Sequence, residues 1–277
     1  MKFQNIRVMN FENALRGMRN PKDSWHLSDS EFGINNYQVV SEKIKELYPN
    51  EEDRIKAHQD HIIYSSNGYV EYAFIGPNDM ELAKKLIKGG PEHRKFLRQI
   101  FVSVDITAPL YFWKELDTYK VGTVANSTST MHTIHKSPIT IDNFEIDDYN
   151  EDLKLIDDVS IGLRADCFIN DLEQLRQLYL QYTEAAKKEV DIAKKKDLLI
   201  LAKKYWKELI RWTPNAWLQT RTVTMNYENL LGMCSVGQRR FHKLNEWSGI
   251  DDKTVNNFIK FARQLPYSSD LIFIDEQ

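Results

Sequence analysis

The sequence predicts an α+β fold, with a mixed or antiparallel central sheet packed with helices. Runs of β-type residues gather early, at 60–75 and 97–107, whereas helical periodicity dominates 170–264. The chain has 277 residues, 42% of them hydrophobic, which is enough to bury a substantial core. We therefore expect a single α+β domain over residues 1–277.

The first elements follow from local patterns. Residues 1–10 and 37–48 hold short apolar runs, with helical spacing only in VVSEKIKEL. The 60–75 run predicts a β-hairpin, because Asn67-Gly68 separates two β-rich halves. Pro77 opens a helix with one apolar face, which Gly89-Gly90 ends. The alternation in 97–107 predicts a strand whose buried face carries Ile100, Val102, Val104 and Ile106.

Helices dominate the remaining chain. Residues 109–117 suit a short helix with Pro109 in its first turn. The acidic segment 137–160 predicts an exposed surface insert. Residues 170–210 predict helix, capped by Asn170 or Asp171 and broken into two antiparallel helices near AAKKEVDIAKKKD. Further helices are expected over 226–244 and 253–264.

Composition and charge exclude several classes of function. The net charge of −3 and the pI of about 6.2 provide no basic field for nucleic acid. The cysteines, Cys167 and Cys234, form no CxxC pair, which fits a reducing compartment. The N-terminus lacks the apolar run of a signal peptide, and no stretch reaches membrane-span length. We expect a cytoplasmic protein with no membrane partner.

Common catalytic and cofactor motifs are also missing from the sequence. His132 and His135 lie three apart, but no Cys or Glu follows at ligand spacing, so no metal site is predicted. The chain contains no GxSxG, GxGxxG or GxxxxGK[ST] motif. A standard hydrolase elbow, a Rossmann site and a P-loop are therefore not indicated.

The segment 105–132 has the composition of an anion-binding site. A strand and a short aromatic helix precede Tyr119 and Lys120, and a loop rich in hydroxyl side chains follows. Backbone N–H groups, hydroxyls and a cation can then converge on an anionic ligand. A second basic stretch, 219–247, contains Arg221 and the pair Arg239-Arg240, whose guanidinium groups suit phosphate or a base carbonyl. Placement near a helix C-terminus is the alternative explanation for that pair.

The order of these elements resembles a divergent flavin-dependent thymidylate synthase, of the kind found in Firmicutes and their phages. The resemblance runs from Pro91-Glu92-His93 through Ala108-Pro109, FWKELDTYK and the hydroxyl loop to TP…QTR…MN…RR…W. It implies a family-like core over about 60–265 and a homotetramer. It also implies a methyltransferase that converts dUMP to dTMP, with methylenetetrahydrofolate as the one-carbon donor and FAD and NADPH as cofactors.

The resemblance assigns a role to individual residues. On the cofactor side, the folate-side histidine falls on His93 and the Arg-His-Arg flavin motif on Thr118-Tyr119-Lys120. Glu228 stands where the family has a flavin-side arginine. The full implied cofactor set is His93, Tyr119, Lys120, Asn126 and Asn226. The implied nucleotide-binding set is Ser127, Thr128, Ser129, Arg221, Arg239 and Arg240, of which Arg240 and Ser129 are expected to be catalytic.

Two further functions stay open on the same fold. The chain could be a nucleotide-binding or interaction protein that has lost redox chemistry, because the flavin motif is altered. It could also be a folate-dependent dUMP hydroxymethylase, which shares the one-carbon step and omits the reduction.

Overall fold

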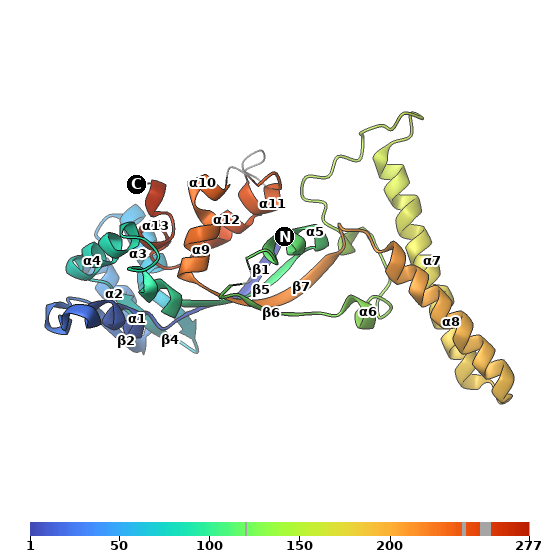
Figure 1. Ribbon diagram of the computed structural model, residues 1–277, viewed down its shortest axis with the longest axis horizontal. Coiled ribbons are helices and arrows are strands. Elements are labelled where there is room, and N and C mark those ends of the chain that lie inside the picture. The colour runs from blue at the N-terminus through green and yellow to red at the C-terminus, as the bar shows by residue number, and fades with distance from the viewer. Residues whose placement is uncertain (120, 240–241, 250–255, 277) are drawn as a thin grey trace. The chain divides into compact units, whose positions relative to one another are not determined.

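The computed structural model describes residues 1–119, 121–239, 242–249 and 256–276 (Figure 1). Its strands form two sheets. The four-stranded sheet has the order β1 (Lys2–Met9), β5 (Phe101–Pro109), β7 (Leu218–Asn226), β6 (Val124–Ser127). The three-stranded antiparallel sheet has the order β2 (Glu31–Asn36), β4 (Tyr69–Phe74), β3 (Ile62–Ser66). Helices pack with these strands, which confirms the predicted α+β class.

The chain divides into two compact units. The first, here called the helical unit, comprises Met1, Thr107–Lys114 and Ser127–Arg221. The second, the larger unit, comprises Lys2–Ile106, Glu115–Asn126 and the chain from Thr222 onward. The single domain and the 60–265 core stay predictions. Among the described residues, no helix is long and apolar enough to cross a membrane.

The predicted hairpin is present in the larger unit. β3 and β4 are joined at Asn67 and Gly68, whose φ values of 51° and 80° are those that a tight hairpin turn needs. Two helices, α2 (Tyr37–Leu47) and α3 (Glu51–His61), pack against this sheet. Their shared core consists of Val40, Ile44, Ala57 and Val70.

Helices α1 (Phe11–Arg19) and α4 (Pro77–Lys88) continue the larger unit. α4 begins at Pro77 and ends at Lys88 with Gly89 as its C-cap, as predicted. A buried ion pair joins the two helices, since Arg19 Nε lies 2.5 Å from Asp79 Oδ1. The Oγ atoms of Ser28 and Ser30 donate to the other oxygen of Asp79. This network keeps a buried carboxylate fully hydrogen-bonded.

β5 confirms the predicted strand, with two adjustments at its ends. Ile100, Val102, Val104 and Ile106 are at most 1% exposed, as their alternation predicted. The strand starts at Phe101 because Lys95–Gln99 forms a 3₁₀ turn. Pro109 ends the strand instead of starting the helix, and α5 covers Leu110–Leu116.

The expected 226–244 helix is wrong as a single element. It is divided into α9 (Tyr227–Cys234) and α10 (Val236–Arg239). Ser235 is extended, with ψ 146°, and the N–H of Val236 donates to Asp275 Oδ2 at 2.7 Å. The long-range acceptor replaces the helical hydrogen bond. The remaining C-terminal helices are α11 (Asn245–Ser248), α12 (Phe258–Arg263) and α13 (Ser268–Leu271).

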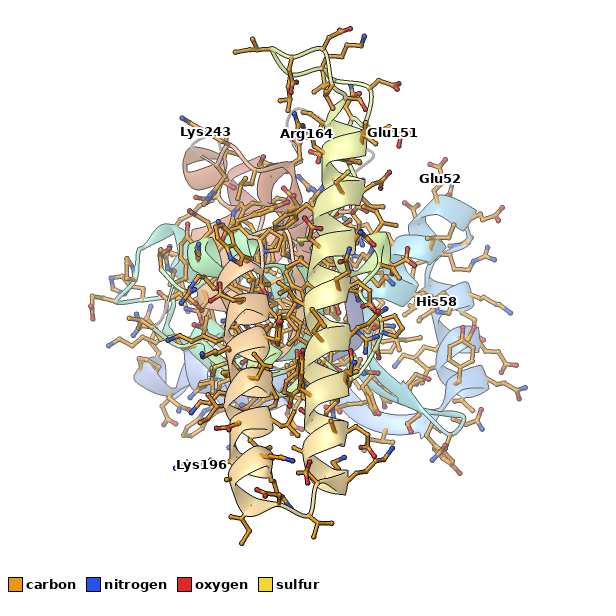
Figure 2. All side chains as sticks on the ribbon, turned by 90° about the vertical axis from the view of Figure 1, so that its right-hand side faces the viewer. Glu52, His58, Glu151, Arg164, Lys196 and Lys243 are labelled. Carbon is orange, nitrogen blue, oxygen red and sulfur yellow. The ribbon has the colours of Figure 1, made fainter. Side chains whose placement is uncertain are left out.

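A long helical hairpin forms most of the helical unit. α7 (Ile161–Lys188) and α8 (Ile192–Trp212) lie side by side, with Lys196 near the connecting turn and Arg164 at the opposite end (Figure 2). The break is where the sequence predicted it, but the predicted cap at Asn170 or Asp171 is wrong. Ser160 caps α7 instead, because its hydroxyl accepts from Leu163 N–H at 3.2 Å.

The acidic segment 137–160 is largely exposed but is anchored at two points. Ile139 and Phe144 are buried in a core with residues of α7 and α8. The N-terminal amine of Met1 lies 3.1 Å from Glu145 and 2.7 Å from Asp147. The 3₁₀ turns of the described chain are Asn20–Lys22, Trp25–Leu27, Lys95–Gln99, Ile141–Asn143 and Ile274–Glu276.

Candidate functional site

In the helical unit, the hydroxyl-rich loop is hydrogen-bonded along β7. The backbone N–H of Thr128 donates to the carbonyl of Thr220 at 2.9 Å, and Thr128 Oγ1 lies 3.2 Å from the same oxygen. Gln219 Nε2 donates to Thr128 O at 2.8 Å. The loop follows β6 directly, and Ser129 then leads into the short helix α6 (Thr130–Thr133). The hydroxyl groups are therefore held beside the strand that carries Arg221.

Arg221 is a half-buried residue of β7 with a defined orientation. Its Nε donates to Gln219 Oε1 at 3.0 Å, and its guanidinium carbon lies 4.4 Å from the centre of the Trp113 ring. Trp113 is itself 1% exposed, and its indole N–H lies within 3.1 Å of the carbonyls of Ala108 and Gln219. A buried ring thus fixes the cation, which favours recognition of an anion.

Gln219 is a site residue that the sequence reasoning missed. It contacts both the hydroxyl loop and Arg221, so it couples the two halves of the predicted nucleotide site. The sequence contained a signal for Gln219, because residues two apart in a strand point to the same face. The motif QTR places Gln219 and Arg221 at that spacing.

A small polar cavity of about 190 Å³ opens beside the loop. Four hydroxyl side chains line it together with apolar residues of the core: Thr128, Thr130, Thr133 and Ser137, with Ile134 and Trp217 among the others. Thr133 Oγ1 already donates to Ser129 O at 2.8 Å. The cavity is below the roughly 300–1,000 Å³ of whole-ligand pockets, so it suits one polar group of a ligand.

In the larger unit, Tyr119 belongs to an aromatic cluster. Its ring stacks on the fully buried ring of Trp247, with centroids 5.4 Å apart, and its hydroxyl lies 3.1 Å from His242 Nε2. His242 Nδ1 lies 3.2 Å from Glu115. Burial lowers the pKa of His242 even though Glu115 acts to raise it. The imidazole is therefore neutral at physiological pH. Tyr119 is held by its stacking on Trp247 and by the contact of its hydroxyl with His242.

Asn226 caps α9 with its side chain. Its Oδ1 accepts from Asn229 N–H at 2.9 Å, and Asn229 Oδ1 accepts from Asn226 N–H at 3.2 Å. Asn226 is 7% exposed. The turn at Gly122 lies against both amides, with φ 81°, and a Cβ there would come within 2.9 Å of Asn226 Nδ2. Asn226 thus has a structural task that the sequence did not predict.

Glu228, two residues after Asn226 and in the first turn of α9, is held by two arginines. Arg94 Nε lies 3.2 Å from its carboxylate, and Arg98 donates to both carboxylate oxygens. Burial acts to raise the pKa of Glu228, but the hydrogen bonds from Arg98 and Arg94 bring it below its ordinary value of 4.5. The carboxylate is ionised at neutral pH, so this position carries a paired negative charge.

His93 lines a large cleft in the larger unit. The cleft has a volume of about 930 Å³ and lies between α1, α4 and the 95–99 turn. Its apolar wall comprises Met18, Leu27, Leu82, Leu86 and Phe96, and its cationic side chains include Lys22, Lys85 and Lys95. Glu92 also lines it, paired with Lys95 at 3.4 Å. Such a cleft suits a large flat ligand that carries negative charge.

The predicted site residues fall into both units. Ser127, Thr128, Ser129 and Arg221 belong to the helical unit, whereas His93, Tyr119, Asn126 and Asn226 belong to the larger unit. Asn126 and Ser127 are exposed on β6. Lys120, Arg240 and the side chain of Arg239 lie outside the described residues. A single site built from both groups stays a prediction.

Comparison with known proteins gives likenesses in structure alone. No family model and no curated protein matches the sequence. Thymidylate Synthase X from Helicobacter pylori, solved with FAD and dUMP, aligns with a TM-score of 0.42 and 14% identity over 89% of this chain and 98% of that one. A UMP/dUMP methylase from Streptomyces cacaoi, bound with 5-Br UMP, aligns with a TM-score of 0.28 and 9% identity over 73% of each chain.

Proposed function

We propose that this chain acts on dUMP as a flavin-dependent thymidylate synthase-like enzyme. It would methylate dUMP to dTMP, with methylenetetrahydrofolate as the one-carbon donor and FAD and NADPH as cofactors. The observation that supports this best is the fixed hydroxyl loop beside the oriented guanidinium of Arg221. These groups are the ones that a nucleotide phosphate requires.

The nucleotide roles follow from the chemistry of each group. The hydroxyls of Ser127, Thr128 and Ser129 would orient the phosphate, and Arg221 would neutralise its charge. Arg240, with Arg239 beside it, would polarise the pyrimidine carbonyl and so stabilise a developing enolate. In a homotetramer, neighbouring subunits would supply further cations to each site.

The cleft at His93 fits the one-carbon donor. A folate has a flat heterocycle, an aromatic linker and carboxylates at its far end. The apolar wall with Phe96 suits the rings, and Lys22, Lys85 and Lys95 suit the carboxylates. The methylene carbon that the folate supplies becomes the methyl group of dTMP.

The flavin side fits less well, because its residues are engaged within this chain. Asn226 caps α9, Tyr119 stacks on Trp247, and Glu228 is an ionised acid held by two arginines. We derive no step through FAD from them. This observation favours a second candidate: a nucleotide-binding protein, or a folate-dependent hydroxymethylase that needs no reduction.

Tritium release from 5-tritiated dUMP separates these functions. The purified chain is incubated with methylenetetrahydrofolate and NADPH, with and without FAD, and the nucleotide products are analysed. FAD-dependent release with formation of dTMP supports the first proposal. Release without FAD that yields 5-hydroxymethyl-dUMP supports the hydroxymethylase. No release, together with dUMP binding, contradicts both enzymes and supports the binding protein.

A further inference from the structure

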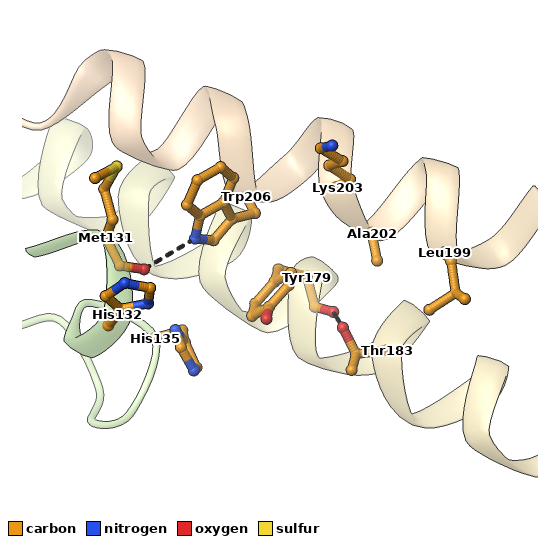
Figure 3. Close-up of a pocket in the computed structure, with 9 residues that line it drawn as sticks. All are labelled: Met131, His132, His135, Tyr179, Thr183, Leu199, Ala202, Lys203 and Trp206. Atoms are coloured by element: carbon orange, nitrogen blue, oxygen red, sulfur yellow. Dashed lines mark hydrogen bonds between the residues drawn. The ribbon is translucent and has the colours of Figure 1, made fainter.

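A further pocket lies on the helical hairpin and shares no lining residue with the 190 Å³ cavity beside the hydroxyl loop (Figure 3). Its volume is about 360 Å³, within the usual range for small-ligand sites. α6 and the residues after it contribute Met131, His132 and His135, and the two long helices contribute the opposite wall. All of its lining residues belong to the helical unit. The sequence predicted no metal site at His132 and His135, and it assigned the two long helices no function.

Two aromatic rings with fixed orientations form the walls. The indole N–H of Trp206 donates to Met131 O at 3.2 Å, which fixes the ring against the α6 segment. Tyr179 meets the ring of His135 edge-on, with centroids 5.2 Å apart and an interplanar angle of 73°. Ala202 also lines the pocket from α8, and its small side chain fills little of the space. Such walls favour a flat ring.

The charge of the pocket is positive. Lys203 lines its rim and is exposed, and within the described chain it forms no ion pair. None of the described lining residues is an Asp or Glu. An anionic ligand would therefore meet a cation and no opposing carboxylate.

His135 provides an unused polar atom. Its Nδ1 is buried and has no hydrogen-bond partner among the described residues. Burial lowers the pKa of His135, and Lys136, Arg176 and His132 lower it further, so the ring is neutral near pH 7. A neutral imidazole nitrogen can donate or accept according to its tautomer. Buried polar atoms normally have partners, and this one has no surface open to the pocket, so a ligand group would meet it once the imidazole ring turns toward the pocket.

We propose that this pocket binds a small aromatic anion, a flat ring that carries a carboxylate or phosphate and a neighbouring polar substituent. The ring would pack between Trp206 and Tyr179, and the anionic group would pair with Lys203. The substituent would complete the hydrogen bonding of His135 Nδ1 after the imidazole ring turns toward it. A metal ion is the competing occupant, but the described chain has no group of three metal-ligating side chains.

Calorimetric titration with salicylate tests this proposal, because salicylate combines a flat ring, a carboxylate and an adjacent hydroxyl. We expect salicylate to bind, and both salicylamide, which lacks the charge, and cyclohexanecarboxylate, which lacks the flat ring, to bind about tenfold more weakly or not at all. Phenyl phosphate, titrated in parallel, shows whether the pocket prefers phosphate to carboxylate.

Variants locate the binding. Lys203→Gln removes the charge, and His135→Phe keeps a ring but removes the nitrogen. Each substitution should weaken the binding of salicylate about fivefold to tenfold. Lys204→Gln, next in sequence and outside the pocket, is the matched control and should bind like the wild type, as should Arg221→Gln. Thermal unfolding confirms that each variant is folded. The absence of salicylate binding, equal binding by Lys203→Gln and Lys204→Gln, or binding of Zn²⁺ that His135→Phe abolishes would each overturn the proposal.

Discussion

At the scale of single residues, the guanidinium of Arg221 shows how the candidate nucleotide site depends on its supports. A free arginine side chain samples many rotamers, and binding an anion would cost that freedom. Trp113 beneath the guanidinium and Gln219 beside it restrict those rotamers before a ligand arrives. The same glutamine fixes the hydroxyl loop. Preorganisation of this kind raises affinity without adding a contact.

Glu228 leads to a prediction about stability at the residue scale. Its folded-state pKa lies below its ordinary value, so its stabilising contribution is present above about pH 4.5 and is lost as the pH falls. Glu228→Gln removes the charge that Arg94 and Arg98 share. We expect the free energy of unfolding to fall by about 1–2 kcal/mol at pH 7, with a smaller difference at pH 4.

Urea denaturation at the two pH values measures this effect. Glu92→Gln is the control, because Glu92 is highly exposed and forms only a 3.4 Å pair with Lys95. That variant should change the unfolding free energy by less than about 0.5 kcal/mol. If the two variants are equally stable, the ion pairs of Glu228 with Arg94 and Arg98 do not stabilise the fold.

At the scale of elements, the sequence predicted a helix or turn correctly where neighbouring residues determine its ends. Asn67-Gly68 predicted the hairpin turn, and Pro77 and Gly89 marked the two ends of α4. Contacts between residues that are far apart in the sequence could not be predicted from local patterns. The break between α9 and α10 depends on Asp275, which is far from Val236 in the sequence. The early start of α7 depends on Ser160, which lies within the segment that the sequence predicts to be an acidic insert.

The attachment of α3 to the C-terminal segment leads to a second stability prediction. Asp60, near the end of α3, is 8% exposed and accepts from Tyr267 N–H at 2.7 Å. Burial raises the pKa of Asp60 to about 6. A raised carboxyl pKa means that stability is present below about pH 4 and is lost as the pH rises through 6.

Asp60→Asn removes this titration and keeps an acceptor for Tyr267. We expect the unfolding free energy of the variant, relative to wild type, to rise by roughly 1–3 kcal/mol between pH 4 and pH 7. Chemical denaturation across that range measures it. Asp53→Asn, an exposed carboxylate on the same helix, is the control and should show no such rise. If the difference in unfolding free energy between Asp60→Asn and wild type does not change with pH, burial does not raise the pKa of Asp60.

At the scale of the whole molecule, the sequence predicted the α+β class and the loop with Arg221, but not what surrounds them. The cleft at His93 is built partly from Met18, Lys22 and Leu27, in a region for which the sequence predicted no helix or strand. Cavities arise from packing between distant elements, so no local pattern encodes them. The contacts of Asn226 with Gly122 and of Tyr119 with Trp247 could not be predicted for the same reason, because they are tertiary contacts.

The most direct test of the proposed nucleotide site is calorimetric binding of dUMP to the whole chain, with Arg221→Gln and Arg211→Gln as matched variants. Arg211 is exposed on α8, where it pairs with Glu208. We expect wild type and Arg211→Gln to bind dUMP alike and Arg221→Gln to bind it at least about tenfold more weakly. Deoxyuridine, which lacks the phosphate, should bind poorly to all three. No binding of dUMP to the wild type, or equal binding by Arg221→Gln, would contradict the proposed nucleotide site.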